Sequence, residues 1–164
     1  VSRLDKGTSG LLIAAKSGYV HDRLRRALHS DNLRREYRAV AIGKVEPPSG
    51  VIDAPIGRAE GSIIRRCVCA DGLPSLTEYE VLQMNDRFTL LRLCPRTGRT
   101  HQLRVHMAHL GYPLAGDWLY GREDKALIAR PALHSYALWF TQPVTMQELH
   151  FTVPVPQDMQ RLME

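Results

Sequence analysis

Short runs in which apolar and polar side chains alternate recur along most of this chain, and they limit the folds it can adopt. The clearest run covers residues 36–42 and ends at Gly43. Alternation with a period of two puts one face of a strand in a core and the other in solvent. Further strands are expected at 51–56, 66–70, 75–83, 87–94, 133–140 and 149–153, and an apolar run after Gly10 predicts a buried strand at 11–15.

Two segments have the periodicity of an amphipathic helix. The first follows Ser17, a residue type that caps helices, and has four apolar residues on one face: Val20, Leu24, Ala27 and Leu28. The second covers residues 100–110, stops at Gly111 and turns three side chains inward: Leu103, Met107 and Leu110. Many strands, few helices and no regular β-α-β alternation predict a mixed α+β domain around a largely antiparallel sheet. After Pro156 we expect only a short polar tail.

Length and cysteine content are those of one ordinary globular domain. The 164 residues fit a single domain that covers residues 1–164. No apolar run approaches the roughly 18 residues of a membrane span, and no signal peptide opens the chain. Cys67, Cys69 and Cys94 lack the second pair that would complete a zinc site. We expect a cytoplasmic monomer with free cysteines, no bound metal and no membrane contact.

Arginine dominates the basic residues, and the positive charge is concentrated in the first part of the chain. Of 22 basic residues, 18 are Arg. Residues 1–66 carry 13 basic and 7 acidic residues, whereas residues 67–164 carry 9 and 10. A guanidinium makes bidentate contacts with phosphates and stacks on bases. This distribution favours a nucleic-acid-binding surface, although an arginine-rich enzyme from a GC-rich genome would show the same composition.

A carboxylate lies between two cations near the start of the chain. Residues 3–10 read Arg-Leu-Asp-Lys-Gly-Thr-Ser-Gly, so Asp5 stands just before a turn of small residues that leads into the strand expected next. Small residues let a ligand approach the backbone closely. Asp5 could serve there as a nucleophile or base. Alternatively, it could simply cap its own turn.

A second polar segment leads into the helix expected at 100–110. Residues 95–106 read Pro-Arg-Thr-Gly-Arg-Thr-His-Gln-Leu-Arg-Val-His. Free N–H groups at a helix start, together with Arg96, Arg99 and Arg104, form the kind of site that binds an anion. The spacing puts Arg104 beside the apolar stripe, from where it could reach a neighbouring loop. The alternative is a solvated basic helix start.

The histidines His101, His106 and His109 raise the alternative of a metal-dependent hydrolase. Their spacing does not place them on one clean helix face, and no carboxylate or cysteine accompanies them at metal-ligand spacing. We expect no metal here, and a measurement of metal content would discriminate.

Residues 3–12 resemble the motif around the catalytic aspartate of the RluA-type RNA pseudouridine synthases. Three further features resemble that family in the same order: residues 35–43, residues 97–106 with Gly111-Tyr112-Pro113 and Gly116-Asp117 behind them, and Leu133-His134. Ser2 stands where the family usually has His, a departure expected to tune the loop. The family also has core strands ahead of this motif, and often a small RNA-binding domain. We therefore expect the N-terminal strands of the catalytic domain to be missing from residues 1–164.

The resemblance implies the catalytic-domain fold of these enzymes and the isomerisation of specific uridines to pseudouridine in structured RNA, without cofactor or metal. It implies that Asp5 is the catalytic carboxylate and that Arg104 is its partner, which keeps it ionised and oriented. It also implies that Tyr37 stacks on the flipped uracil or assists a proton transfer. Without the family context, Tyr37 could equally cover a face of the sheet.

Further contacts to the substrate are expected from five residues: Arg3, Thr8, Arg99, His101 and Leu133. Arg3 is a candidate to fill the gap that base flipping leaves in the RNA, or it could only brace its loop. Leu133 matches an apolar position that lines the pocket in the family, although core packing explains it almost equally well.

A wider basic face is expected to contact RNA phosphates without reading sequence: Arg23, Arg25, Arg26, Arg34, Arg35 and Arg38. Arg35 and Arg38 could equally pair with Glu36 and Asp31 on a solvated edge. Large-subunit ribosomal RNA is the preferred substrate, and transfer RNA is the alternative. From another class of function, the chain could be a catalytically inert RNA-binding fragment of the same fold, which an assay of turnover would reveal.

Overall fold

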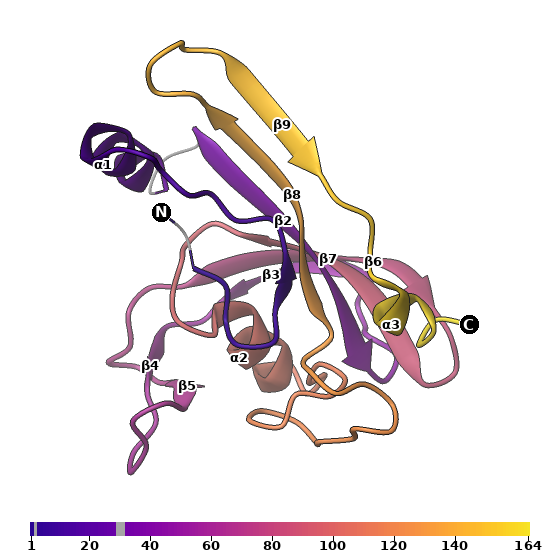
Figure 1. Ribbon diagram of the computed structural model, residues 1–164. Helices are drawn as coiled ribbons and strands as arrows, with labels where there is room; N and C mark the ends of the chain where they lie inside the picture. The colour runs from indigo at the N-terminus through magenta and orange to yellow at the C-terminus, as the bar shows by residue number, and fades with distance from the viewer. Residues whose placement is uncertain (2, 29–31) are drawn as a thin grey trace.

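In the described part of the chain, seven strands form one mixed, largely antiparallel sheet (Figure 1). The computed structural model describes residues 1, 3–28 and 32–164, so Ser2 and Asp31 lie outside the described residues. Across the sheet the strands are β1 (Ser9–Gly10), β8 (Leu133–Thr141), β2 (Leu33–Ile42), β7 (Phe88–Pro95), β6 (Leu76–Met84) and β3 (Ser49–Asp53), with β9 (Glu148–Thr152) also on β8. A separate hairpin consists of β4 (Ile56–Arg58) and β5 (Arg66–Val68). The predicted α+β class is confirmed.

The helices are α1 (Gly18–Ala27), α2 (Gln102–His109) and the short α3 (Gln157–Gln160). Ser17 caps α1 as predicted, because its hydroxyl accepts a hydrogen bond from the Val20 N–H at 3.3 Å.

The prediction that Leu110 turns inward was wrong. This residue follows the last turn of α2 and is 36% exposed, while Gly111 reverses the chain with a φ of 87°. Among the described helices, none is long and apolar enough to cross a membrane.

Strand β2 separates two hydrophobic cores, because alternate side chains point to opposite faces of the sheet. Tyr37 and Ala39 face α2 and pack in the core that contains Leu103. Val40 points to the other face and packs in the core that contains Met159 of α3. The strand predicted at 36–42 forms, but its second face is covered rather than in solvent: Ala39, Val40 and Ala41 are all buried, and Ile42 is 36% exposed. This strand puts Tyr37 on the same side of the sheet as α2.

The strand predicted at 11–15 does not form. Only Ser9 and Gly10 pair with β8, opposite His134 and Ser135, and β9 occupies the same edge of β8 from Ala137 onward. The apolar side chains of this segment instead join a core with α1 and the ends of β2 and β8: Leu11, Ile13 and Ala15. The predicted burial holds for Ile13, whereas Leu12 is 56% exposed, and the edge of the sheet that a strand here would need is occupied by β9.

The end of the chain is more ordered than the predicted polar tail. Met159 and Leu162 are buried against the sheet. Asp158 forms a bidentate ion pair with Arg130, at 2.8 and 2.9 Å. Another nitrogen of Arg130 lies 3.2 Å from the carbonyl of Gly7 and 3.1 Å from that of Leu133. Helix α3 is thus connected through one guanidinium to the loop at the start of the chain.

Candidate active site

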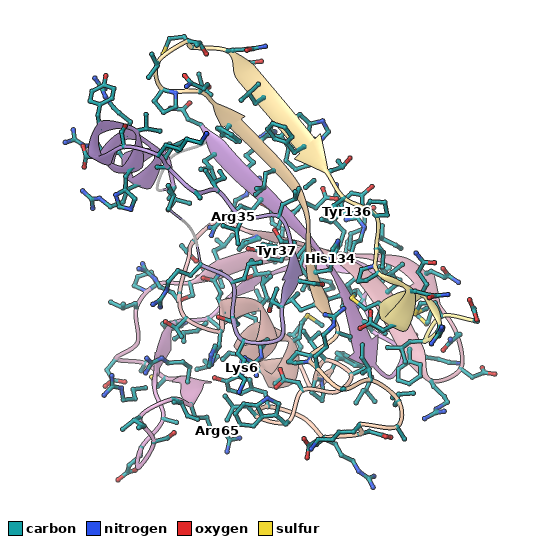
Figure 2. All side chains as sticks on the ribbon, viewed as in Figure 1. Lys6, Arg35, Tyr37, Arg65, His134 and Tyr136 are labelled. Carbon is teal, nitrogen blue, oxygen red and sulfur yellow. The ribbon has the colours of Figure 1, made fainter. Side chains whose placement is uncertain are left out.

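A cleft of about 540 Å³ opens between the N-terminal loop, β2 and the loop before α2. Its lining includes Asp5 and most of the other residues singled out from the sequence: Arg3, Thr8, Arg35, Tyr37, Arg99, His101 and Leu133. Figure 2 marks Tyr37 and Arg35 on β2 and Lys6 on the loop that carries Asp5. Segments far apart in the sequence therefore meet in one cavity.

The loop that carries Asp5 is fixed at its far end by close backbone contacts. The Thr8 N–H donates to the Asp5 carbonyl at 2.9 Å, which closes a turn around Gly7. Gly10 has a φ of 106°, and a Cβ there would lie 2.2 Å from the Ser135 carbonyl oxygen. Only glycine fits this position without a shift of backbone. The loop must therefore lie flat against β8.

A buried histidine also holds this loop. The Ser9 hydroxyl lies 2.8 Å from Nδ1 of His134, whose Nε2 lies 3.4 Å from the Val153 carbonyl. Since a carbonyl only accepts, Nε2 carries the proton and Nδ1 accepts from Ser9. Burial lowers the pKa of His134, which agrees with a neutral ring. The family motif flagged His134 without indicating this contact.

Arg104 lies between two carboxylates beneath the cleft. Its side chain is 2% exposed, and its Nη1 lies 3.9 Å from an oxygen of Asp5. Its Nε and Nη2 donate to both oxygens of Asp117, at 2.7 and 2.8 Å. Burial alone would lower the pKa of Arg104, but the hydrogen bonds and charge of Asp117 outweigh it and raise that pKa. Arg104 therefore presents a permanent positive charge to Asp5.

Asp117 is a functional candidate that the sequence reasoning did not identify. It is fully buried, and it also accepts hydrogen bonds from the N–H groups of Leu119 and Tyr120, at 3.1 and 3.2 Å. These donors satisfy the carboxylate and fix its orientation. The Gly116-Asp117 pair was part of the family resemblance, which was the available signal.

Tyr120 was also missed, and it connects three parts of the site. Its hydroxyl accepts from the Arg66 N–H at 2.9 Å and lies 2.8 Å from Nδ1 of His101. The Arg104 guanidinium lies 5.1 Å from the centre of its ring. His101 has a left-handed φ of 59°, a strained conformation for a residue with a side chain. Burial lowers the pKa of His101, partly offset by the charge of Asp5.

Tyr37 forms part of the cleft wall while most of its ring is buried. It is 8% exposed and packs with Leu133 and Leu103. Burial raises the pKa of its phenol, opposed by the positive charge of the neighbouring Arg35. The phenol is therefore protonated at neutral pH. Leu133 both lines the cleft and packs in the core, so the two interpretations of this residue hold together.

Gln102 shapes the loop that leads into α2. Its carbonyl oxygen accepts from the Thr97 hydroxyl and the Arg99 N–H, at 2.8 and 3.0 Å. Its amide donates to the Leu76 carbonyl and the Thr77 hydroxyl on β6, both at 3.0 Å. Arg35 adds a contact to the Thr97 carbonyl at 3.1 Å. The loop is thus attached to the sheet from both sides.

The other arginines of the expected basic face lie outside the cleft lining. Arg23, Arg25 and Arg26 are on α1, where Asp22 pairs with Arg25 and Arg26 at 3.2 and 2.9 Å. Arg34 lies over the Trp139 ring. Arg38 pairs with Glu36 and lies 4.0 Å from the centre of the Tyr136 ring, with its side chain 15% exposed. Arg38 thus pairs with Glu36, as the alternative predicted, but the pair is largely buried rather than on a solvated edge.

The histidine cluster offers no metal site in the described residues, where no group of three potential ligands gathers. His106 is fully buried, and its nitrogens lie 2.9 Å from the Thr77 hydroxyl and the Ala54 carbonyl. Burial lowers the pKa of this ring. Both nitrogens are committed to the fold, so His106 acts as a structural residue.

Comparison with known proteins points to one family. The family model described as RNA pseudouridylate synthase matches residues 1–109. The chain belongs to this family. An uncharacterized RNA pseudouridine synthase of Bacillus subtilis, YjbO, is 44% identical over 164 residues, which cover 100% of this chain and 58% of that protein. The ribosomal large subunit pseudouridine synthase D of Vibrio parahaemolyticus is 42% identical over 177 residues, covering 100% of this chain and 54% of that protein.

A solved structure supports the same assignment. Human RNA pseudouridylate synthase domain containing 1 superposes with a TM-score of 0.80 at 30% identity, over 93% of this chain and 66% of that one. The resemblance to RluA-type pseudouridine synthases, inferred from the motifs, is confirmed. The chain spans just over half the length of the curated relatives described above.

Proposed function

We propose that this chain is the catalytic part of an RNA pseudouridine synthase in which Asp5 is the catalytic carboxylate. The proposal treats residues 1–164 as one catalytic domain. The observation that carries it is the 3.9 Å separation of Asp5 and Arg104 at a cleft with Tyr37 in its wall. A fully buried guanidinium beside a partly buried carboxylate holds that carboxylate in place.

The reaction breaks the bond between uracil N1 and ribose C1′, turns the base and joins C5 to C1′. Carbon C5 loses a proton and N1 gains one, so the atoms balance without a redox partner. In this proposal Asp5 forms the transient bond that lets the base detach, and Arg104 holds its charge. The ring of Tyr37 stacks on the base, and its hydroxyl assists removal of the C5 proton.

Substrate contacts are assigned to residues that line the cleft. The Thr8 hydroxyl is buried and has no hydrogen-bond partner among the described residues, which favours a bond to the substrate. Arg99 and His101 border the entrance to α2, and Leu133 supplies an apolar surface for the ring. Arg3 is exposed at the rim, where its planar group can take the place of the flipped base.

The proposed target is large-subunit ribosomal RNA. Relatives from Vibrio parahaemolyticus and Nitrosomonas europaea that carry the name ribosomal large subunit pseudouridine synthase D support this choice, at 42% and 41% identity. Transfer RNA is the alternative, and both belong in the test.

The test uses transcripts of both RNAs that carry tritium at uracil C5, because isomerisation releases that hydrogen to water. We expect release from ribosomal RNA by the wild-type chain and none by Asp5→Asn, which keeps the shape of the side chain and retains RNA binding. Asp86→Asn, on the distant turn between β6 and β7, is the matched control and keeps full release. RNA binding without release by the wild-type chain would instead support the inert RNA-binding fragment. Near-normal release by Asp5→Asn would contradict the role of Asp5.

A further inference from the structure

A second cleft, of about 430 Å³, adjoins the candidate active site. Three of its lining residues, Gly98, Arg99 and Thr100, also line the catalytic cleft, so this loop is a shared wall. The remaining lining comes from the β4–β5 hairpin and the segment after it: Ile56, Gly57, Arg58, Arg66, Asp71, Gly72 and Leu73. None of the catalytic residues proposed above lies in this second cleft.

The charge of this cleft is positive. Its charged lining residues are Arg58, Arg66, Arg99 and one acid, Asp71. Arg58 and Arg66 are direct partners in the β4–β5 pairing, so their side chains stand next to each other on one face. Within the described ranges, neither guanidinium has an ion pair of its own. Like charges directly opposite each other destabilise a strand pair, and an anion between them would relieve that repulsion.

The hairpin is also connected to His101, which lines the catalytic cleft. The Arg66 N–H donates to the Tyr120 hydroxyl, which contacts His101. Across the cleft, Nε of Arg99 donates to the Pro74 carbonyl at 3.1 Å, which orients its remaining N–H groups. The second cleft is therefore held in a fixed position relative to the first.

We propose that this second cleft binds one phosphodiester group of the RNA strand adjacent to the flipped uridine, with Arg58 and Arg66 as its principal ligands and Arg99 at the shared wall. This inference rests on the proposed function. A base drawn into the catalytic cleft brings its own backbone to the rim, and the shared wall of Gly98, Arg99 and Thr100 lies between that cleft and the second one. Paired guanidinium groups suit phosphate oxygens because their N–H groups form a fork.

The experiment measures binding rather than turnover. The affinity of a labelled, short single-stranded RNA with one central uridine is followed by fluorescence anisotropy over a range of salt concentrations. For single strands, each phosphate contact contributes about 0.7 to the slope of log affinity against log salt. We expect the double Gln variant, which combines Arg58→Gln and Arg66→Gln, to reduce the steepness of that slope by about 0.7. The double Lys variant, which combines Arg58→Lys and Arg66→Lys, should keep most of the wild-type steepness because it keeps both charges.

A chemical control locates the contact. Replacing the phosphate on the 5′ or the 3′ side of the uridine with an uncharged methylphosphonate should weaken binding to the wild type at one position. The same replacement should have no further effect on the double Gln variant. Arg161→Gln is the matched control, since α3 and the β4–β5 hairpin lie on opposite sides of the molecule in Figure 1.

The inference is overturned if the double Gln variant keeps the wild-type slope of log affinity against log salt. It is also overturned if the methylphosphonate, at both the 5′ and the 3′ position, weakens binding to the double Gln variant as much as it weakens binding to the wild type. Failure of the proposed function gives a different result: no tritium release, with the binding pattern intact. Loss of the binding pattern with intact tritium release overturns this inference alone.

Discussion

Asp117 holds Arg104 through both carboxylate oxygens, at 2.7 and 2.8 Å, and leaves the third guanidinium nitrogen facing Asp5. Asp117 and Arg104 are 0% and 2% exposed. The orientation of the positive charge is therefore set by a buried residue that itself lies outside the lining of the cleft. A partner that is already in place needs no rearrangement when the substrate arrives.

Asp117→Asn should be among the most destabilising single changes in this protein. Removing one member of a buried ion pair leaves the other charge unpaired and costs about 3–5 kcal/mol of the free energy of unfolding. Urea unfolding measures that loss, and the tritium assay should show little activity at temperatures where the variant is still folded. Asp86→Asn, at a fully exposed carboxylate, is the comparison. Equal stability of the two variants would show that the Asp117–Arg104 pair does not hold the fold.

Tyr37→Phe separates the two roles proposed for Tyr37. The ring remains, so RNA affinity should be unchanged, whereas loss of proton transfer should lower kcat by about 10²–10⁴-fold. Tyr37→Ala should also weaken binding, by about 1–3 kcal/mol, because base stacking is lost. Single-turnover tritium release and anisotropy measure the two effects separately. Full activity of Tyr37→Phe would leave the stacking role and eliminate the role in proton transfer.

Tyr120→Phe tests the connection between the hairpin and the catalytic loop. It removes the contacts to the Arg66 N–H and to His101, so the free energy of unfolding should fall by about 1 kcal/mol. The nuclear magnetic resonance signals of the His101 ring should shift, and kcat should drop. Tyr19→Phe on α1, where the ring is 57% exposed, should change none of these quantities. An unchanged His101 signal in Tyr120→Phe would show that this hydrogen bond is absent in solution.

Stability should fall as the solution becomes acidic. Burial lowers the pKa of His106 from its ordinary value of 6.5, and it lowers those of His101 and His134 as well. As the pH drops through about 6.5, the unfolded chain takes up protons that the folded chain does not, so unfolding becomes easier. Urea unfolding at several pH values measures this slope. His106→Gln should reduce it by at most about 1.4 kcal/mol per pH unit. A flat profile between about pH 7.5 and 5.5 would contradict the neutral buried rings.

The positions of β2, β6, β7 and β8 could be predicted from alternation, although β2 contributes to a core on each of its faces. The failures have one physical cause. Ile13 of the run at 11–15 and the residues Met159 and Leu162 are buried, but burial does not say which surface covers a segment. Segment 11–15 does not extend the sheet because β9 already pairs with β8 there. The C-terminal residues are buried because α3 packs against the sheet.

The residues of the candidate site that belong to the sequence motifs could be predicted. Asp5, Tyr37 and His101 come together in one cleft as expected. The contacts of Asp117 and Tyr120 were not predictable, because they depend on a loop that folds back beneath α2. The spacing allowed Arg104 to reach a neighbouring loop, but it did not identify the carboxylate of Asp117, 13 residues later, as its partner.

Arg130 donates hydrogen bonds both to Asp158 and to the Gly7 carbonyl, which makes the last helix a remote support for the first loop. A tag, fusion partner or protease cut that disturbs α3 would therefore act as an inhibitor from outside the cleft, by loosening the turn that carries Asp5. The same connection offers a reporter. A fluorophore on α3 could register the arrival of RNA at the far side of the sheet without touching the substrate.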